Sequence, residues 1–176
     1  HPPHPPPPPL PQNLYFLLIR RPPRSTPVTP RRQRQMCIRD RTKGEDDVVA
    51  LMATVACEVH HSDVRFDWTG FYRVTGPEML KIGPYQGGHG CLVIPFSRGV
   101  CGAAARTREV QLVPDVDAFP GHIACASSTR SELVLPVTDR NGQLIGVFDI
   151  DSDQPDAFTV ADAKGIAAVL DAAFKN

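Results

Sequence analysis

The chain has 176 residues with 19 basic and 19 acidic side chains, so its formal net charge is zero. A length of this order allows one domain of ordinary size. The sequence has no apolar run of the roughly 18 residues that a membrane-spanning helix requires, which excludes such a helix.

The balanced charge conceals two kinds of sequence joined end to end. Residues 1–41 contain eight Arg and one Asp, and 12 of the 19 prolines fall in the same stretch. Such composition buries little apolar surface, so we expect residues 1–42 to form a disordered arm. A basic arm that binds nucleic acid is one interpretation. We favour an artefactual origin, because Tyr15–Pro27 and Arg31–Arg41 resemble translated sequencing-adapter DNA, and we therefore expect no nucleic-acid partner.

Residues 43–176 are predicted to form one organised domain that begins with a helix. Apolar residues recur at helical spacing over about four turns, at Val48, Met52, Val55 and Val59. Acidic residues 45–47 suit the positive end of this helix. Cys57 lies inside it, and we expect a buried, inert thiol there.

The rest of the domain alternates β-forming runs with turns. Strands are predicted at 67–74, 79–85, 91–95, 109–113, 132–137 and 143–150, with a short helix at 103–106. Asn141-Gly142 marks a hairpin between the last two strands. Thr159 caps a final helix whose apolar stripe is Val160, Ala163, Ile166, Ala167, Leu170 and Phe174. The order predicts an α+β fold, with a mainly antiparallel sheet of about six strands and helices packed on it.

Three cysteines are candidates for chemistry. Cys91 and Cys101 are 10 residues apart, and Cys101 and Cys125 are 24 apart, so no Cys-x-x-Cys pair is present. Cys91 and Cys125 stand beside Gly-rich or loop sequence, where exposure favours thiol reactivity. Packing is the plainer interpretation of these thiols. A zinc site built from them with His89 and His122 is a third, although the spacing fits no common zinc signature.

Carboxylates and aromatic residues could complete a site around these thiols. Asp149 and Asp151 alternate at the end of a strand, so both face one side of the sheet, and Glu132 could join them. A buried acid can donate a proton, and two or three acids can bind a ligand's ammonium group. Trp68 and Tyr72 share one face of the first strand, where they either pack in the core or line a pocket.

Residues 44–176 resemble the GAF-domain family of free methionine-(R)-sulfoxide reductases. The resemblance rests on the three-cysteine spacing and on six motifs, at 67–72, 83–87, 99–102, 121–125, 131–136 and 145–151. It implies a GAF-like fold over residues 43–176. Family members begin with a further helix that helps to form a homodimer, and residues 1–41 stand in its place here.

The resemblance also implies a reaction, in which free L-methionine (R)-sulfoxide is reduced to L-methionine. Cys125 would attack the sulfoxide, one of the three acids would protonate its oxygen, and Cys91 would resolve the sulfenic acid as a disulfide. Cys101 would be an alternative resolving thiol or a relay. Glu132, Asp149 and Asp151 would bind the ammonium, with Trp68 and Tyr72 around the S-methyl end.

The implied reaction sets expectations for partners and location. No bound cofactor is expected; a thioredoxin-type protein would reduce the disulfide, with NADPH entering only through the thioredoxin system. Five cysteines without a small secreted framework favour a cytoplasmic protein. The alternative function is a GAF-type sensor that binds a small molecule without turnover, against which the three thiols argue.

Overall fold

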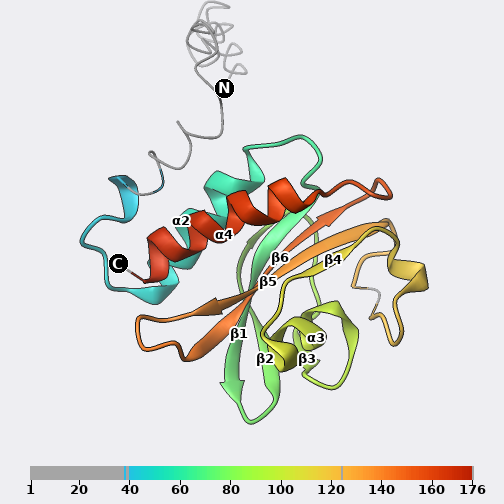
Figure 1. Ribbon diagram of the computed structural model, residues 1–176, viewed down its shortest axis with the longest axis horizontal. Helices are drawn as coiled ribbons and strands as arrows, with labels where there is room; N and C mark the ends of the chain where they lie inside the picture. The colour runs from blue at the N-terminus through green and yellow to red at the C-terminus, as the bar shows by residue number, and fades with distance from the viewer. Residues whose placement is uncertain (1–37, 39, 124, 176) are drawn as a thin grey trace, which may run out of the picture.

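The structure is an antiparallel sheet with helices on both faces. The computed structural model describes residues 38, 40–123 and 125–175, so the predicted arm at 1–42 lies outside it except for 38 and 40–42. Six strands form one sheet in the order β3-β2-β1-β6-β5-β4 (Figure 1), and every neighbouring pair is antiparallel. The α+β prediction is confirmed. In the described part of the chain, no helix has the length and apolar character to cross a membrane.

The elements follow one another in the predicted order. The strands are β1 Trp68–Gly76, β2 Met79–Gln86, β3 Val93–Pro95, β4 Gln111–Val113, β5 Ser131–Thr138 and β6 Leu144–Ser152. The helices are α2 Val48–His60, α3 Gly99–Thr107 and α4 Val160–Phe174, with a short 3-10 helix, η2, at Val116–Ala118. The hairpin predicted at Asn141-Gly142 joins β5 to β6, and Gly142 adopts the left-handed φ of 77° that such a turn needs.

The two faces of the sheet bury different cores. α2 and α4 lie side by side across one face (Figure 1), where Phe71, Leu133 and Phe148 pack against their apolar stripes. α3 covers the other face, where Trp68 and Tyr72 belong to a second core. Side chains alternate along a strand, so β1 supplies aromatic rings to both cores. This second face carries the candidate site.

Capping residues set where the outer helices begin. Asp47 caps α2, accepting hydrogen bonds from the backbone N–H groups two and three residues further on, so the acidic residues at 45–47 precede the helix instead of forming its first turn. Thr159 caps α4 as predicted and forms a capping box with Asp162. Val48 and Val160, predicted on the buried stripes, are each the first residue of a helix and stay exposed.

The prediction for the short helix was wrong at its start. α3 begins at Gly99 and not at Ala103, so Cys101 lies within the helix. The early start brings the helix close to the chain before it, and a Cβ on Gly102 would lie 2.6 Å from the carbonyl oxygen of Pro95. Glycine at 102 therefore permits this packing, which places Cys101 over the sheet.

The prediction that Cys57 is buried was also wrong. Its thiol is exposed on α2. Val55, Ala56 and Val59 face the sheet and are almost fully buried, so position 57 points away from the core. Cys57 Sγ lies 3.9 Å from Nδ1 of His61, one turn further on.

Candidate active site

Three carboxylic acids converge where β5 and β6 pair. Glu132 of β5 stands opposite Asp151 of β6, and Asp149 lies on the same face of β6. The three side chains are buried, with exposed fractions of 8% for Glu132, 6% for Asp149 and 9% for Asp151. The pairing of the two strands thus brings together the acids that the sequence singled out.

Burial disfavours the charged forms of these acids. It raises the pKa of Glu132 to about 9, with the charge of Asp151 as the second cause. Burial and then Glu132 raise the pKa of Asp149 well above its usual range, and burial and then Asp149 do the same for the pKa of Asp151. At neutral pH the cluster therefore stores protons, which it can give to a leaving group or exchange for a cation.

Two oxygens of the cluster lack hydrogen-bond partners. Asp149 Oδ1 and Asp151 Oδ1 are buried and contact no donor among the described residues. Buried unpartnered oxygens favour a ligand that brings donors or positive charge. The three acids offer oxygens within 4.8 Å of one another, so they could hold a metal ion or an ammonium group.

Two of the candidate thiols are joined in a disulfide. Cys91 precedes β3, and Cys125 lies in the loop between η2 and β5; their Cα atoms are 5.1 Å apart across 34 residues of sequence. Both residues are half-buried. The pairing agrees with the disulfide that the family resemblance implies. It also uses two thiols of the alternative zinc set, which is therefore not assembled in this state.

The third thiol, that of Cys101, contacts one of the acids. Cys101 is buried on α3, and its S–H donates to Asp149 Oδ2 at 3.2 Å. Burial and the nearby Asp149 raise the pKa of Cys101 well above its usual range. Cys101 is therefore a protonated thiol here, and a thiol is a much weaker nucleophile than a thiolate.

Stacked aromatic rings stand beside the acids. Trp68 stacks on Tyr72 with ring centroids 5.7 Å apart, and on Tyr85 with centroids 5.3 Å apart. Trp68 is in register with Asp151 across β1 and β6, so both side chains occupy one face of the sheet. Gly70 leaves room for this ring, because a Cβ there would lie 2.6 Å from it. Neither Trp68 nor Tyr72 lines the cavity at the acids, and their contact with a ligand stays a prediction.

A small cavity connects the acids to the thiols. Its volume is about 20 Å³, which is room for roughly one water molecule. The polar side chains in its wall are Cys101, His122, Cys125, Thr129, Glu132, Asp149 and Asp151. This space is smaller than an amino acid.

His122, a candidate zinc donor and a neighbour of Cys125 in the sequence, also belongs to the site. Its Nε2 lies 3.0 Å from Glu132 Oε1, and both side chains are largely buried. Its position three residues before Cys125, in the same loop, is the signal that could have identified it. We call residues 119–130 the Cys125 loop; Ala124 within it lies outside the described residues.

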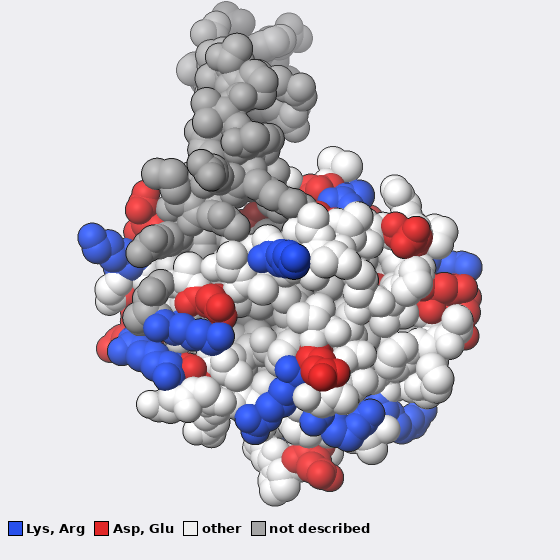
Figure 2. Space-filling view, viewed as in Figure 1, with Lys and Arg blue, Asp and Glu red and all other residues white. Residues whose placement is uncertain are grey.

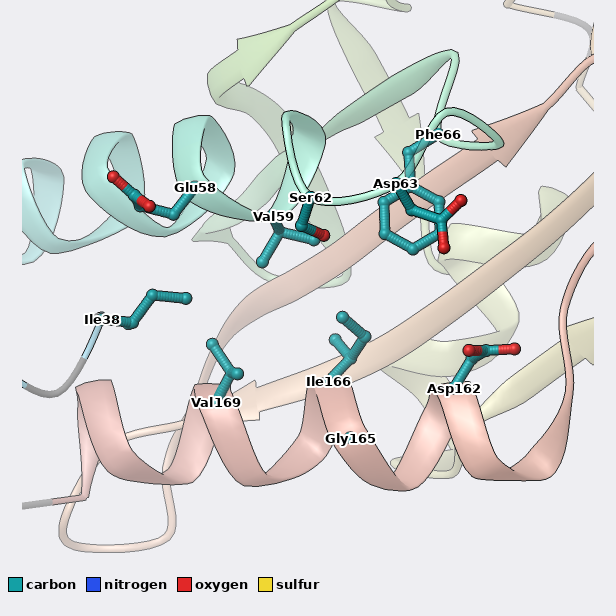
Figure 3. Close-up of a pocket in the computed structure, with 10 residues that line it drawn as sticks. All are labelled: Ile38, Glu58, Val59, Ser62, Asp63, Phe66, Asp162, Gly165, Ile166 and Val169. Atoms are coloured by element: carbon teal, nitrogen blue, oxygen red, sulfur yellow. The ribbon is translucent and has the colours of Figure 1, made fainter. Parts of the chain in front are cut away.

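The other surfaces of the molecule offer less chemistry. A second hollow of about 80 Å³ lies between α2 and α4, away from the cavity (Figure 3). Apolar side chains and the acids Glu58, Asp63 and Asp162 line it, and no cysteine is among its described lining residues. On the face seen in Figure 2, Lys and Arg are interspersed with Asp and Glu, so the described residues there form no basic patch.

Known proteins share this sequence pattern. The profile of the GAF domain matches residues 42–173. A free methionine-R-sulfoxide reductase from Escherichia coli (strain K12) is 41% identical over 127 residues, which are 72% of this chain and 76% of that protein.

Solved structures share the fold. The free methionine-R-sulfoxide reductase of Neisseria meningitidis, solved in complex with its substrate, has a TM-score of 0.74 and 34% identity, covering 85% of this chain and 92% of that chain. A protein from Burkholderia vietnamiensis described as a GAF sensor has a TM-score of 0.78 and 39% identity, covering 83% of this chain and 92% of that one. These likenesses confirm the predicted GAF-like fold.

Proposed function

We propose that this chain, which belongs to the GAF-domain family and is a homologue of the free methionine-R-sulfoxide reductases, reduces free L-methionine (R)-sulfoxide to L-methionine. The observation that carries the proposal is the Cys91–Cys125 disulfide beside the buried acids. A disulfide is what thiol-dependent sulfoxide reduction leaves on an enzyme. The buried acids are the proton source that the same reaction requires.

The acid cluster binds the substrate through its free ammonium group. Replacing one stored proton with the ammonium supplies positive charge and donors to the unpartnered oxygens of Asp149 and Asp151, and the protons that remain are available for the sulfoxide oxygen. Glu132 completes the receptor. A methionine sulfoxide within a polypeptide has an amide in place of the ammonium, so this receptor favours the free amino acid. Trp68 and Tyr72 line the S-methyl end, which the register of Trp68 with Asp151 supports.

Cys125 is the nucleophile, because it lines the cavity with the acids, and Cys101, which lines it too, is a buried protonated thiol. Its thiolate attacks the sulfoxide sulfur, and one acid of the cluster protonates the sulfoxide oxygen. The sulfur–oxygen bond of the substrate then breaks and the oxygen passes to Cys125. Methionine leaves, and Cys125 is oxidised to a sulfenic acid.

Cys91 resolves the sulfenic acid. Its thiol attacks Cys125 Sγ, water leaves, and the Cys91–Cys125 disulfide forms. A thioredoxin-type dithiol then reduces the disulfide by exchange and is itself oxidised, which makes NADPH the ultimate electron source. Cys101 is the alternative resolving thiol, supported by its place in the cavity wall. Recycling by such a reductant suits a reducing compartment, so a cytoplasmic location forms part of the proposal.

A coupled assay tests this function. Thioredoxin, its reductase and NADPH are supplied with the free R epimer, the free S epimer or N-acetylated R-sulfoxide. We expect turnover of the free R epimer only. Cys125→Ser should lower kcat by roughly a thousandfold or more because the nucleophile is lost, while its circular dichroism stays unchanged. Cys57→Ser, on the opposite side of the sheet, is the control and should keep full activity.

The same assay distinguishes the proposed reductase from the alternative function, a sensor that binds a small molecule without turnover. The similarity to the protein described as a GAF sensor favours that alternative. A sensor would bind the amino acid and oxidise no NADPH. Undiminished turnover by Cys125→Ser, or equal turnover of both epimers, would contradict the proposal.

A further inference from the structure

We propose that His122 is a positioning residue that holds the Cys125 loop, and with it the Cys125 thiol, against the acid cluster. This inference rests on the proposed function, because it concerns delivery of the nucleophile to the substrate. It starts from the contact between His122 Nε2 and Glu132 Oε1 at 3.0 Å. Through this contact the loop that carries Cys125 meets the strand that carries an acid.

The Cys125 loop has few other attachments. The backbone N–H of Gly99 donates to the carbonyl of Gly121 at 3.0 Å, and the N–H of Arg130 donates to the carbonyl of Ser152 at 2.8 Å. Between these anchors, the described residues make one side-chain hydrogen bond to the rest of the fold, which joins His122 and Glu132. Phe119 and Ile123 of the loop also pack against the second core. The remaining tie is the disulfide, which exists only in the oxidised protein.

The tie therefore matters once the disulfide is reduced. Cys125 is three residues beyond His122, and three residues of chain span at most about 11 Å. With His122 held at Glu132, the backbone at Cys125 stays within that span of the backbone at His122, which keeps the thiol on the side of the acids. Without it, the loop is held by the packing of Ile123 and by the backbone hydrogen bonds at Gly121 and Arg130, so the thiol has more freedom and ordering it for attack costs more entropy.

The contact is also well suited to a buried acid. It needs one proton between its two atoms: either protonated Glu132 donates to Nε2, or the Nε2–H donates to the carboxylate. Hydrogen bonding is therefore kept whichever partner carries the proton. Glutamine at 122 could make the same contact through its amide, whereas alanine or leucine could not.

Alkylation of the reduced chain measures the tie directly. Each reduced full-length protein is treated with iodoacetamide, and the rate at Cys125 is followed by peptide mass spectrometry relative to exposed Cys57. We expect His122→Ala to raise the Cys125 rate by about tenfold, the equivalent of about 1.4 kcal/mol of lost closure. His122→Gln, which can keep the hydrogen bond, should leave the Cys125 rate within about twofold of the wild-type rate. Lys164→Ala, at an exposed position of α4 on the opposite side of the sheet, is the control and should match the wild type.

Two further readouts separate positioning from general structural damage. In His122→Ala, the plateau of the alkylation rate against pH should be higher than in the wild type, and the midpoint of the profile should be the same. The reason is that the loop opens without changing the chemistry of the thiol. In turnover assays kcat should fall by about tenfold with KM nearly unchanged, since the acids that bind the substrate remain in place. His122→Leu, which retains most of the side-chain volume, replaces His122→Ala if circular dichroism shows that the latter fails to fold.

An unchanged Cys125 rate in a folded His122→Ala or His122→Leu variant would overturn the inference. So would a variant whose KM rises while kcat stays the same, because His122 would then act on substrate binding. The alkylation result needs no substrate. If the chain lacked the proposed reductase activity, the alkylation result could still be interpreted. Each of the two hypotheses can therefore fail without the other.

Discussion

Replacing Glu132 by Gln tests whether the acid cluster stores protons. The usual pKa of a glutamate is 4.5, and burial raises the pKa of folded Glu132 to about 9. Between these values the folded chain keeps a proton that the unfolded chain has lost. A group with a raised folded pKa contributes its full stability below the unfolded value, and that contribution is lost as pH rises toward the folded value. Glutamine has a similar shape and no proton to lose.

The size of the effect follows from the number of protons. When the folded state binds one proton more than the unfolded state, the free energy of unfolding falls by about 1.4 kcal/mol for each unit by which the pH rises. Asp149 and Asp151, whose pKa values are also raised, contribute in the same direction. The wild type should therefore lose stability from about pH 5.5 to pH 8, and Glu132→Gln should reduce the slope by about 1.4 kcal/mol per unit.

Urea unfolding of the oxidised protein at pH 6, 7 and 8 measures the slope. The chain has a single Trp, and Trp68 is buried next to the cluster, so its fluorescence reports the transition. Glu109→Gln, at an exposed site, is the control and should keep the wild-type slope. If the Glu132→Gln slope equals that of the wild type, Glu132 titrates normally and the proton-store argument fails.

Two more predictions address packing and metal. Gly70→Ala should lower the free energy of unfolding by about 1–3 kcal/mol, measured by urea denaturation, because its Cβ would lie 2.4 Å from Cβ of Tyr85. Gly76→Ala is the control, because a Cβ added at Gly76 would meet nothing within 4 Å apart from its neighbours in the chain. Equal losses of stability in both variants would contradict the packing argument. Incubation with EDTA and gel filtration should leave turnover of the free sulfoxide unchanged, because the three acids bind an ammonium in the proposed reaction. A loss that Mn²⁺ or Zn²⁺ restores would show that the cluster needs a metal ion.

Local sequence determined most of the secondary structure. Alternation along a strand predicted that Asp149 and Asp151 share a face, and the Asn141-Gly142 turn predicted the hairpin, because both signals act over a few residues. The family motifs supplied the Cys91–Cys125 pair. Helix starts were less predictable. α3 begins at Gly99, and Gly102 permits the close approach to the Pro95 carbonyl that follows from this start; such a packing contact leaves little trace in local propensity.

The site itself depended on tertiary contacts. The register of β5 against β6 put Glu132 opposite Asp151 in the protein interior, where burial and then the neighbouring acids raise their pKa values. The link from His122 to Glu132 joins a loop to a strand, so no periodicity in the sequence announces it. The exposure of Cys57 was decided by which face of α2 met the sheet. The sequence by itself thus determined which reactive groups the protein has, whereas burial and distance, which arise only when remote segments pack, decided their protonation and their partners.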